Sequence, residues 1–120
     1  MSDQLFLKII KREIPAEIVF ENDNVLAFKD IMPQAPIHVL FIHKVPTRNI
    51  NESMREAPQQ ILEIFSAIQE YTVAEGLEAP GFRIVANTNA HGGQTVFHTH
   101  FHLLAGAPLG GFGLSRSNMK

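Results

Sequence analysis

The chain has 120 residues, a formal net charge of −2 and a pI of about 6.3, with 45% hydrophobic and 18% charged residues. This length suffices for one domain with one hydrophobic core, and the composition excludes an intrinsically disordered chain. The small net charge excludes a general electrostatic affinity for nucleic acid or anionic membranes, so we expect neither as a partner.

The chain contains no cysteine, which excludes a disulfide framework and thiolate zinc sites and fits a reducing compartment. No apolar stretch reaches the length of a membrane span, and the first residues lack the uninterrupted apolar core of a signal peptide. We therefore expect a cytoplasmic protein.

The first third of the chain predicts one helix and three strands. Residues 3–12 place their apolar side chains on one side at helical spacing, which predicts a short helix. Residues 17–21 and 25–29 are rich in β-branched and aromatic side chains, and Asn22-Asp23-Asn24 between them has turn chemistry, so we expect a β-hairpin. Residues 37–42 are nearly all apolar, which is typical of a strand buried on both faces.

One long helix is predicted from about residue 58 to residue 75. Pro58 suits its first turn, and Gly76 suits the left-handed conformation that often follows a helix end. Ser53 and Glu56 also match a capping box, which would begin the helix several residues earlier. The expected buried stripe consists of Ile61, Phe65, Ile68 and Thr72.

Two more strands complete the predicted sheet, at residues 82–86 and 96–104, with a polar loop at 87–94 between them. The order of elements predicts an α+β domain over residues 1–104: an antiparallel sheet of about five strands, with one short N-terminal and one long helix on one face. Residues 105–120 have the glycine, proline and serine content of a tail.

A row of histidines occupies alternate positions of the last predicted strand, at His98, His100 and His102. Side chains alternate between faces along a strand, so these imidazoles project the same way, with neighbouring Cα atoms roughly 6.6 Å apart. We expect the opposite face to pack on the core; it carries Phe97, Thr99, Phe101 and Leu103. A purely structural role does not explain the row, because each buried imidazole needs a partner and crowded imidazoles cannot all be protonated.

Two kinds of chemistry fit the row. It could bind zinc or iron, with a further ligand from His38, His91 or an acidic residue. It could instead act on a phosphate, with the middle imidazole as nucleophile and its neighbours as hydrogen-bond donors. The amides of Gly92-Gly93 and the hydroxyl of Thr95, just before the strand, could hold such an anion. Residue types alone leave both interpretations open.

The segment His98-Thr99-His100-Phe101-His102-Leu103-Leu104 resembles the His-φ-His-φ-His-φ-φ signature of the histidine-triad (HIT) superfamily, where φ is apolar. Other segments are similar to its nucleotide-binding protein branch, namely Lys8-Ile9-Ile10, Glu13-Ile14-Pro15-Ala16, Leu26-Ala27-Phe28, Asp30-Ile31, Pro33-Gln34-Ala35-Pro36, His38 and Gly92 to His98. The similarity extends from residue 5 to about 104, and the combination is highly specific. It implies the HIT-like fold and a homodimer whose sheets join.

The resemblance also implies an activity and a set of roles. The activity is that of a purine nucleoside 5′-phosphoramidase, which hydrolyses the P–N bond of substrates such as adenosine 5′-phosphoramidate to AMP without a metal or other cofactor. His100 is then the nucleophile that forms a nucleotidyl-histidine intermediate, His98 and His102 flank it, and His38 extends the relay. Asp30 binds the ribose hydroxyls. The α-phosphate contacts are Asn87, Gly93 and Thr95, and the base lies among Leu5, Phe6, Ile9, Phe28 and Ile31.

Several alternatives stay open from the residues. Without the resemblance, Asp30 would equally be a loop cap, and the apolar base-binding residues would pass as core. Within the family, the rival activity is that of a dinucleoside polyphosphate hydrolase or nucleotidyltransferase. A nucleotide-binding regulatory protein with incidental hydrolysis is a third alternative. His43 stands where proline is common in this branch, and we interpret it as a surface variant.

Overall fold

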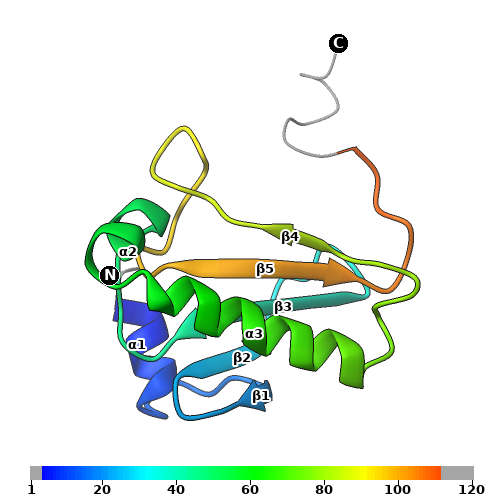
Figure 1. Cartoon of the computed structure of the whole chain (residues 1–120), viewed down its shortest axis with the longest axis horizontal. Coiled ribbons are helices and arrows are strands. Elements are labelled where there is room, and N and C mark those ends of the chain that lie inside the picture. Colours follow the sequence, from blue (N-terminus) through cyan, green and yellow to red (C-terminus); the bar gives the residue numbers. More distant parts are fainter. Residues whose placement is uncertain (1–3, 112–120) are drawn as a thin grey trace.

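The computed structural model describes residues 4–111, which form three helices and a five-stranded sheet. The elements are α1 (Leu5–Ile10), β1 (Ile18–Glu21), β2 (Val25–Lys29), β3 (Ile37–His43), α2 (Ile50–Glu56), α3 (Gln59–Ala74), β4 (Arg83–Val85) and β5 (His100–Ala105) (Figure 1). The strand order is β1-β2-β3-β5-β4, and each pairing is antiparallel. The predicted α+β class and antiparallel sheet are confirmed.

Helices cover both faces of the sheet, with α3 lying along one face (Figure 1). Alternate strand residues such as Val25, Phe41 and Phe101 form one buried cluster with α3. The intervening residues form a second cluster with α1, composed of Phe6, Ile9, Leu26, Phe28, Leu40 and Ile42. The expectation that helices cover one face only is wrong, because β2 and β3 are apolar on both faces and each face needs a cover.

Interactions between neighbouring residues determine the turn of the hairpin and the end of the long helix. The Asn22 side-chain oxygen accepts hydrogen bonds from the amides of Asn24 and Val25, at 2.9 and 2.8 Å, and so closes the turn between β1 and β2. Gly76 follows α3 with a φ of +69°, as predicted. Pro58 is the N-cap of α3 and stands one position before the first turn.

The segment before α3 forms a separate helix that was not predicted. Asn49 caps α2, because its side-chain oxygen accepts the Glu52 amide at 2.9 Å. The capping box proposed for Ser53 and Glu56 is therefore wrong, and Ser53 is a buried residue inside α2.

The buried face of α3 is rotated relative to the prediction. Ile68 and Thr72 are buried as expected, but Phe65 is 41% exposed, and the inward positions instead include Ile64 and Tyr71. Phe65 lies at the margin of the helix–sheet contact, where its ring meets Phe101 edge-on at 5.0 Å. Spacing alone could not distinguish a central position from a marginal one.

The last strand is shorter than predicted, since residues 96–99 lie outside β5. There the Thr99 amide donates to the Thr47 carbonyl at 2.7 Å, and the two threonine hydroxyls lie 2.7 Å apart. This segment is therefore held by the loop after β3. Strand β5 includes Ala105, and residues 106–111 of the predicted tail contain no helix or strand. Residues 112–120 lie outside the described part.

None of the described helices combines the length and the apolar character that a membrane span requires.

Candidate active site

A cavity of about 390 Å³ opens beside α1, at the end of β2 and the start of β5. All the residues that were expected to bind a nucleotide line it: Leu5, Phe6, Ile9, Phe28, Asp30, Ile31, Asn87, Gly93 and Thr95. Two of the four histidines, His100 and His102, line it as well. The volume is that of a small-molecule site, and its lining combines apolar side chains with a few polar ones.

Further lining residues were not predicted, namely Ile14, Pro15, Ala16, Lys29, Gln34, Leu40, Gln94 and Val96. Several of them belong to segments that carried the family resemblance. These residues could have been predicted only from their place in those segments, since their residue types do not mark them as ligand contacts.

His100 lines the cavity with an imidazole whose Nε2 has no hydrogen. Its Nδ1 lies 2.7 Å from the carbonyl oxygen of His98, and the residue is 8% exposed. A carbonyl oxygen only accepts, so Nδ1 carries the hydrogen and Nε2 keeps its lone pair. The ring of Phe6 meets this imidazole edge-on, with centroids 5.0 Å apart, and limits its rotation.

His38 and His102 are joined by a hydrogen bond in which His38 is the donor and His102 the acceptor. The Gln34 amide donates to His38 Nδ1 at 3.1 Å, so the ring hydrogen of His38 lies on Nε2. That Nε2 lies 2.9 Å from His102 Nδ1, which accepts the hydrogen. His102 therefore carries its own hydrogen on Nε2 and can donate it to a ligand. His38 stands behind the cavity wall and acts through His102.

His98 does not point into the cavity. The residue is 1% exposed, and its Nε2 donates to the carbonyl oxygen of His43 at 2.9 Å. His98 still lies on the α1 side of the sheet with His100, because the Phe6 ring meets both imidazoles, with centroids 5.7 and 5.0 Å away. It differs from His100 and His102 in being buried outside the cavity lining, in a segment that lies outside β5. His43 is itself buried at 6% exposure, so its interpretation as a surface variant is wrong.

Asp30 combines the two roles that were considered for it. One carboxylate oxygen accepts the Met32 amide at 2.8 Å, which caps the loop after β2. The other oxygen lies 3.4 Å from His38 Nε2. The residue also lines the cavity, so its cap fixes a carboxylate in the cavity lining.

The loop before β5 brings Gly93 and Thr95 to the cavity, and the Gly93 amide donates to the Ala90 carbonyl within the loop at 3.0 Å. A Cβ on Gly92 would lie 2.6 Å from the carbonyl oxygen of Thr88, so only glycine fits there. The side-chain amide of Asn87 donates to the Gly92 carbonyl at 2.6 Å, and Gly93 follows with a φ of +79°. The loop is thus built to present Gly93 and Thr95.

Gln94 ties this loop to its surroundings. Its side-chain nitrogen donates to the carbonyls of Arg48 and Val96, at 2.7 and 3.0 Å, and its oxygen accepts the Asn89 amide at 2.8 Å. The side chain is 6% exposed and uses both ends of its amide. Its role is to hold the loop in place at the cavity.

Burial lowers the pKa of every imidazole in this group, which comprises His38, His98, His100 and His102. The pKa of His102 falls to about 4, because burial and then the neighbouring His100 and His38 disfavour its charged form. Asp30 raises the pKa of three of them without offsetting burial. The group is therefore neutral at pH 7, as the relay of single hydrogens requires.

These lowered pKa values predict a loss of stability in mild acid. The unfolded chain binds protons at its histidines below about pH 6.5, whereas folded His102 binds one only near pH 4. The contribution of His102 to the free energy of unfolding is therefore complete above pH 6.5 and decreases as the pH falls from 6.5 to 4. His102 alone should lower the unfolding free energy by about 2 kcal/mol between pH 7.5 and pH 5.

Urea unfolding at several pH values measures this slope. The variant His102→Asn should flatten it, while His91→Asn, at an exposed position, should leave it unchanged. An equally steep slope in both variants would contradict the assignment.

One group in the described residues has the composition of a metal site. Ligand atoms of Asp30, His38 and His102 all lie within 4.8 Å of one another. A metal there would have to displace the hydrogen that His38 donates to His102. His91, the other candidate ligand from the sequence, is exposed and does not belong to this group.

Together, the α+β fold and the site define a class of protein: one that presents an unprotonated imidazole nitrogen in a small-molecule cavity beside an apolar slot. Comparison with known proteins identifies the family. The HIT domain family model matches residues 11–109. The chain belongs to the HIT family.

Individual relatives agree with this membership. The purine nucleoside phosphoramidase of Escherichia coli (strain K12) is 44% identical over 108 residues, covering 90% of this chain and 91% of that protein. The adenylylsulfatase HINT1 of Arabidopsis thaliana is 44% identical over 110 residues, covering 88% and 72%. A HIT family hydrolase from Clostridium thermocellum superimposes with a TM-score of 0.85 and 41% identity, covering 92% of this chain and 96% of that one.

Proposed function

We propose that the protein is a purine nucleoside 5′-phosphoramidase, which hydrolyses the P–N bond of adenosine 5′-phosphoramidate-type substrates to a nucleoside monophosphate. One observation carries the proposal: His100 keeps an unprotonated Nε2 in a cavity that also has an apolar slot, a carboxylate and the loop residues Gly93 and Thr95. The 44% identical relative from Escherichia coli is named for this activity.

Each wall of the cavity has a part in binding. The apolar slot takes the purine base; it comprises Leu5, Phe6, Ile9, Phe28 and Ile31. Asp30 accepts hydrogen bonds from the ribose hydroxyls with the oxygen that is not used on Met32. The α-phosphate lies against Asn87, Gly93 and Thr95, next to His100. Neutral donors hold the anion, which leaves the nucleophile uncharged.

In the first step, His100 Nε2 attacks the α-phosphorus, the P–N bond of the substrate breaks, and the amine departs. The amine has to leave with an added proton, and a neutral imidazole pair has none to lose. His102 therefore passes on a proton that the His38–His102 pair takes up from solvent with the substrate, whose negative charge favours the protonated form, and the pair is neutral once the amine has left. The phosphorylated His100 ring is positive, so its hydrogen bond to the His98 carbonyl strengthens as the bond to phosphorus forms.

In the second step, water attacks the same phosphorus and the P–N bond to His100 breaks. The ring recovers its Nε2 lone pair, the monophosphate leaves, and one proton of the water returns to His102. Splitting the hydrolysis this way replaces one difficult displacement by two easier ones.

A side-by-side assay tests the proposal. We expect turnover of adenosine 5′-phosphoramidate at least about tenfold faster, in kcat/KM, than that of a diadenosine polyphosphate, since only the former has an amine leaving group for His102 to protonate. Preference for the dinucleotide would reassign the protein to the dinucleoside polyphosphate hydrolases.

A second candidate is hydrolysis of an adenylyl sulfate, because the Arabidopsis thaliana relative is named an adenylylsulfatase. Sulfate leaves without an added proton, so this reaction would use His100 in the same way but not the hydrogen of His102. A variant His102→Asn that loses phosphoramidase activity while retaining sulfatase activity would separate the two reactions.

The metal interpretation has its own test. Adding a chelator to the purified protein should leave phosphoramidase turnover unchanged, since the proposed mechanism uses imidazoles and polar groups of the cavity and no metal. Loss of activity on chelation, with recovery on adding zinc, would place a metal at Asp30, His38 and His102 instead.

Homodimer formation and a cytoplasmic location belong to the same proposal. Among the described strands, β4 lies at an edge of the sheet, next to the 39% exposed Phe82, and an edge strand can extend a sheet into a second copy. The absence of cysteine fits a reducing compartment. Light scattering and cell fractionation test the two points.

A further inference from the structure

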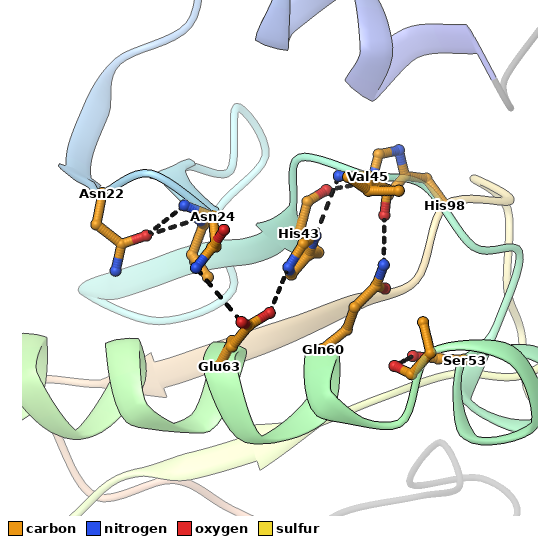
Figure 2. A network of polar contacts seen from close by, with 10 residues as sticks. Asn22, Asn24, His43, Val45, Ser53, Gln60, Glu63 and His98 are labelled. Atoms are coloured by element: carbon orange, nitrogen blue, oxygen red, sulfur yellow. Dashed lines mark hydrogen bonds and ion pairs between the residues drawn. The ribbon is translucent and has the colours of Figure 1, made fainter.

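A chain of polar contacts connects helix α3 with the candidate nucleophile, and its first link is the pair Glu63–His43 (Figure 2). His43, the last residue of β3, places Nε2 2.7 Å from a carboxylate oxygen of Glu63. Asn24 donates to the other oxygen of Glu63 at 3.4 Å. A carboxylate only accepts, so the hydrogen between Glu63 and His43 belongs to His43 Nε2.

The other nitrogen of His43 holds a turn. The Val45 amide donates to His43 Nδ1 at 3.0 Å, which requires that Nδ1 carry no hydrogen. Glu63 thus selects the tautomer of His43 that can accept this amide. A second residue of α3 supports the same turn, because Gln60 donates to the Val45 carbonyl at 3.1 Å (Figure 2).

This turn carries the group that orients His98. The carbonyl oxygen of His43 accepts His98 Nε2 at 2.9 Å (Figure 2), while His98 Nδ1 has no hydrogen-bond partner within the described residues. That one bond therefore fixes the His98 ring. The carbonyl of His98 in turn accepts His100 Nδ1 at 2.7 Å, and it belongs to a segment outside the regular strand.

We propose that Glu63 and His43 are positioning residues for the nucleophile: by fixing the turn after β3, they fix His98 and thereby the tautomer and direction of His100. The inference rests on the proposed function only for the part that His100 plays in turnover. The pair lies outside the cavity and does not touch a substrate.

The test compares Glu63→Ala with Glu63→Gln. The alanine variant removes the acceptor for His43 Nε2 and should lower kcat for adenosine 5′-phosphoramidate by about tenfold, because a displaced nucleophile reacts slowly. The Kd for AMP should stay within about twofold, since the cavity lining is unchanged. The glutamine side chain loses the charge but keeps an acceptor oxygen, so Glu63→Gln should retain most of the wild-type kcat.

Glu70→Ala is the matched control, because it removes an exposed carboxylate from the same helix. It should leave kcat unchanged, and thermal unfolding should show that all three variants are folded. Equal kcat in Glu63→Ala and the wild-type chain would overturn the proposal. An equal loss in the glutamine and alanine variants would overturn it too, since the acceptor would then not be what matters.

A readout without substrate separates this inference from the proposed function. Ring-nitrogen NMR shifts of His100 should report a single tautomer, with hydrogen on Nδ1, in the wild-type and Glu63→Gln chains. They should report a mixture in Glu63→Ala. If no phosphoramidate is hydrolysed but the shifts change as expected, the positioning stands and the proposed function fails. Unchanged shifts in Glu63→Ala would overturn the positioning alone.

Discussion

Replacement of His100 by alanine should lower kcat for adenosine 5′-phosphoramidate by about 10⁴-fold, because it removes the nitrogen that forms the covalent intermediate. AMP should still bind with a Kd within a few-fold of the wild-type value, since the base slot and the loop at Gly93 remain. Single-turnover kinetics and calorimetric titration with AMP measure the two quantities. Rapid quenching should recover a nucleotidyl adduct from the wild-type chain and none from the variant.

The control for this experiment is His91→Ala, which removes an exposed imidazole from the loop before β5. It should leave both kcat and the Kd for AMP unchanged. Near-normal turnover in His100→Ala would refute the covalent mechanism and would favour a water molecule activated elsewhere in the cavity.

Replacement of Phe6 by alanine should lower the free energy of unfolding by about 3 kcal/mol, the usual cost of deleting a buried aromatic ring. Phe6 is 3% exposed. Its ring centroid lies 5.4 Å from that of Phe28 and 5.7 and 5.0 Å from those of the His98 and His100 imidazoles. The same variant should bind AMP less tightly, because Phe6 also lines the cavity. Urea unfolding at fixed protein concentration and AMP titration measure the two effects.

Met54→Ala is the control for Phe6→Ala, because Met54 is a large apolar residue of α2 that is 52% exposed. Its unfolding free energy should change by less than about 0.5 kcal/mol. If Phe6→Ala were no more destabilising than Met54→Ala, α1 would not be a structural part of the active site.

The features predicted correctly depend on neighbouring residues. The turn at Asn22 is closed by amides two and three positions away, and Gly76 takes its conformation from the helix that it ends. The apolar run of β3 is likewise a local pattern. Such signals are complete within a few residues, so a sequence displays them directly.

The features predicted wrongly depend on distant partners. Residues 96–99 leave the strand because Thr99 bonds with Thr47, which is 52 positions away. His43 is buried because it pairs with Glu63, 20 positions away. Neither partner could be identified from spacing, so the burial of His98 outside the cavity was also out of reach.

For the candidate site, the family resemblance predicted which residues lie together, whereas the hydrogen bonds of the folded chain determine which ring nitrogen of each histidine carries the hydrogen. The cavity residues were placed together by matching segments, not by their residue types. The tautomers of His38 and His100 depend on the Gln34 amide and the His98 carbonyl, which are backbone groups that no motif displays. The direction of the relay could therefore be read only from the folded chain.

Strand β5 carries cavity-lining and core side chains in strict alternation. His100 and His102 face the cavity side, while Phe101 and Leu103 belong to the cluster under α3. Inserting or deleting one residue before His100 would send imidazoles into the core and aromatic rings into the cavity in one event. The same alternation of side chains in this strand therefore sets both the packing of the core and the lining of the cavity. Substitutions can tune either one separately, but a shift in length abolishes both together.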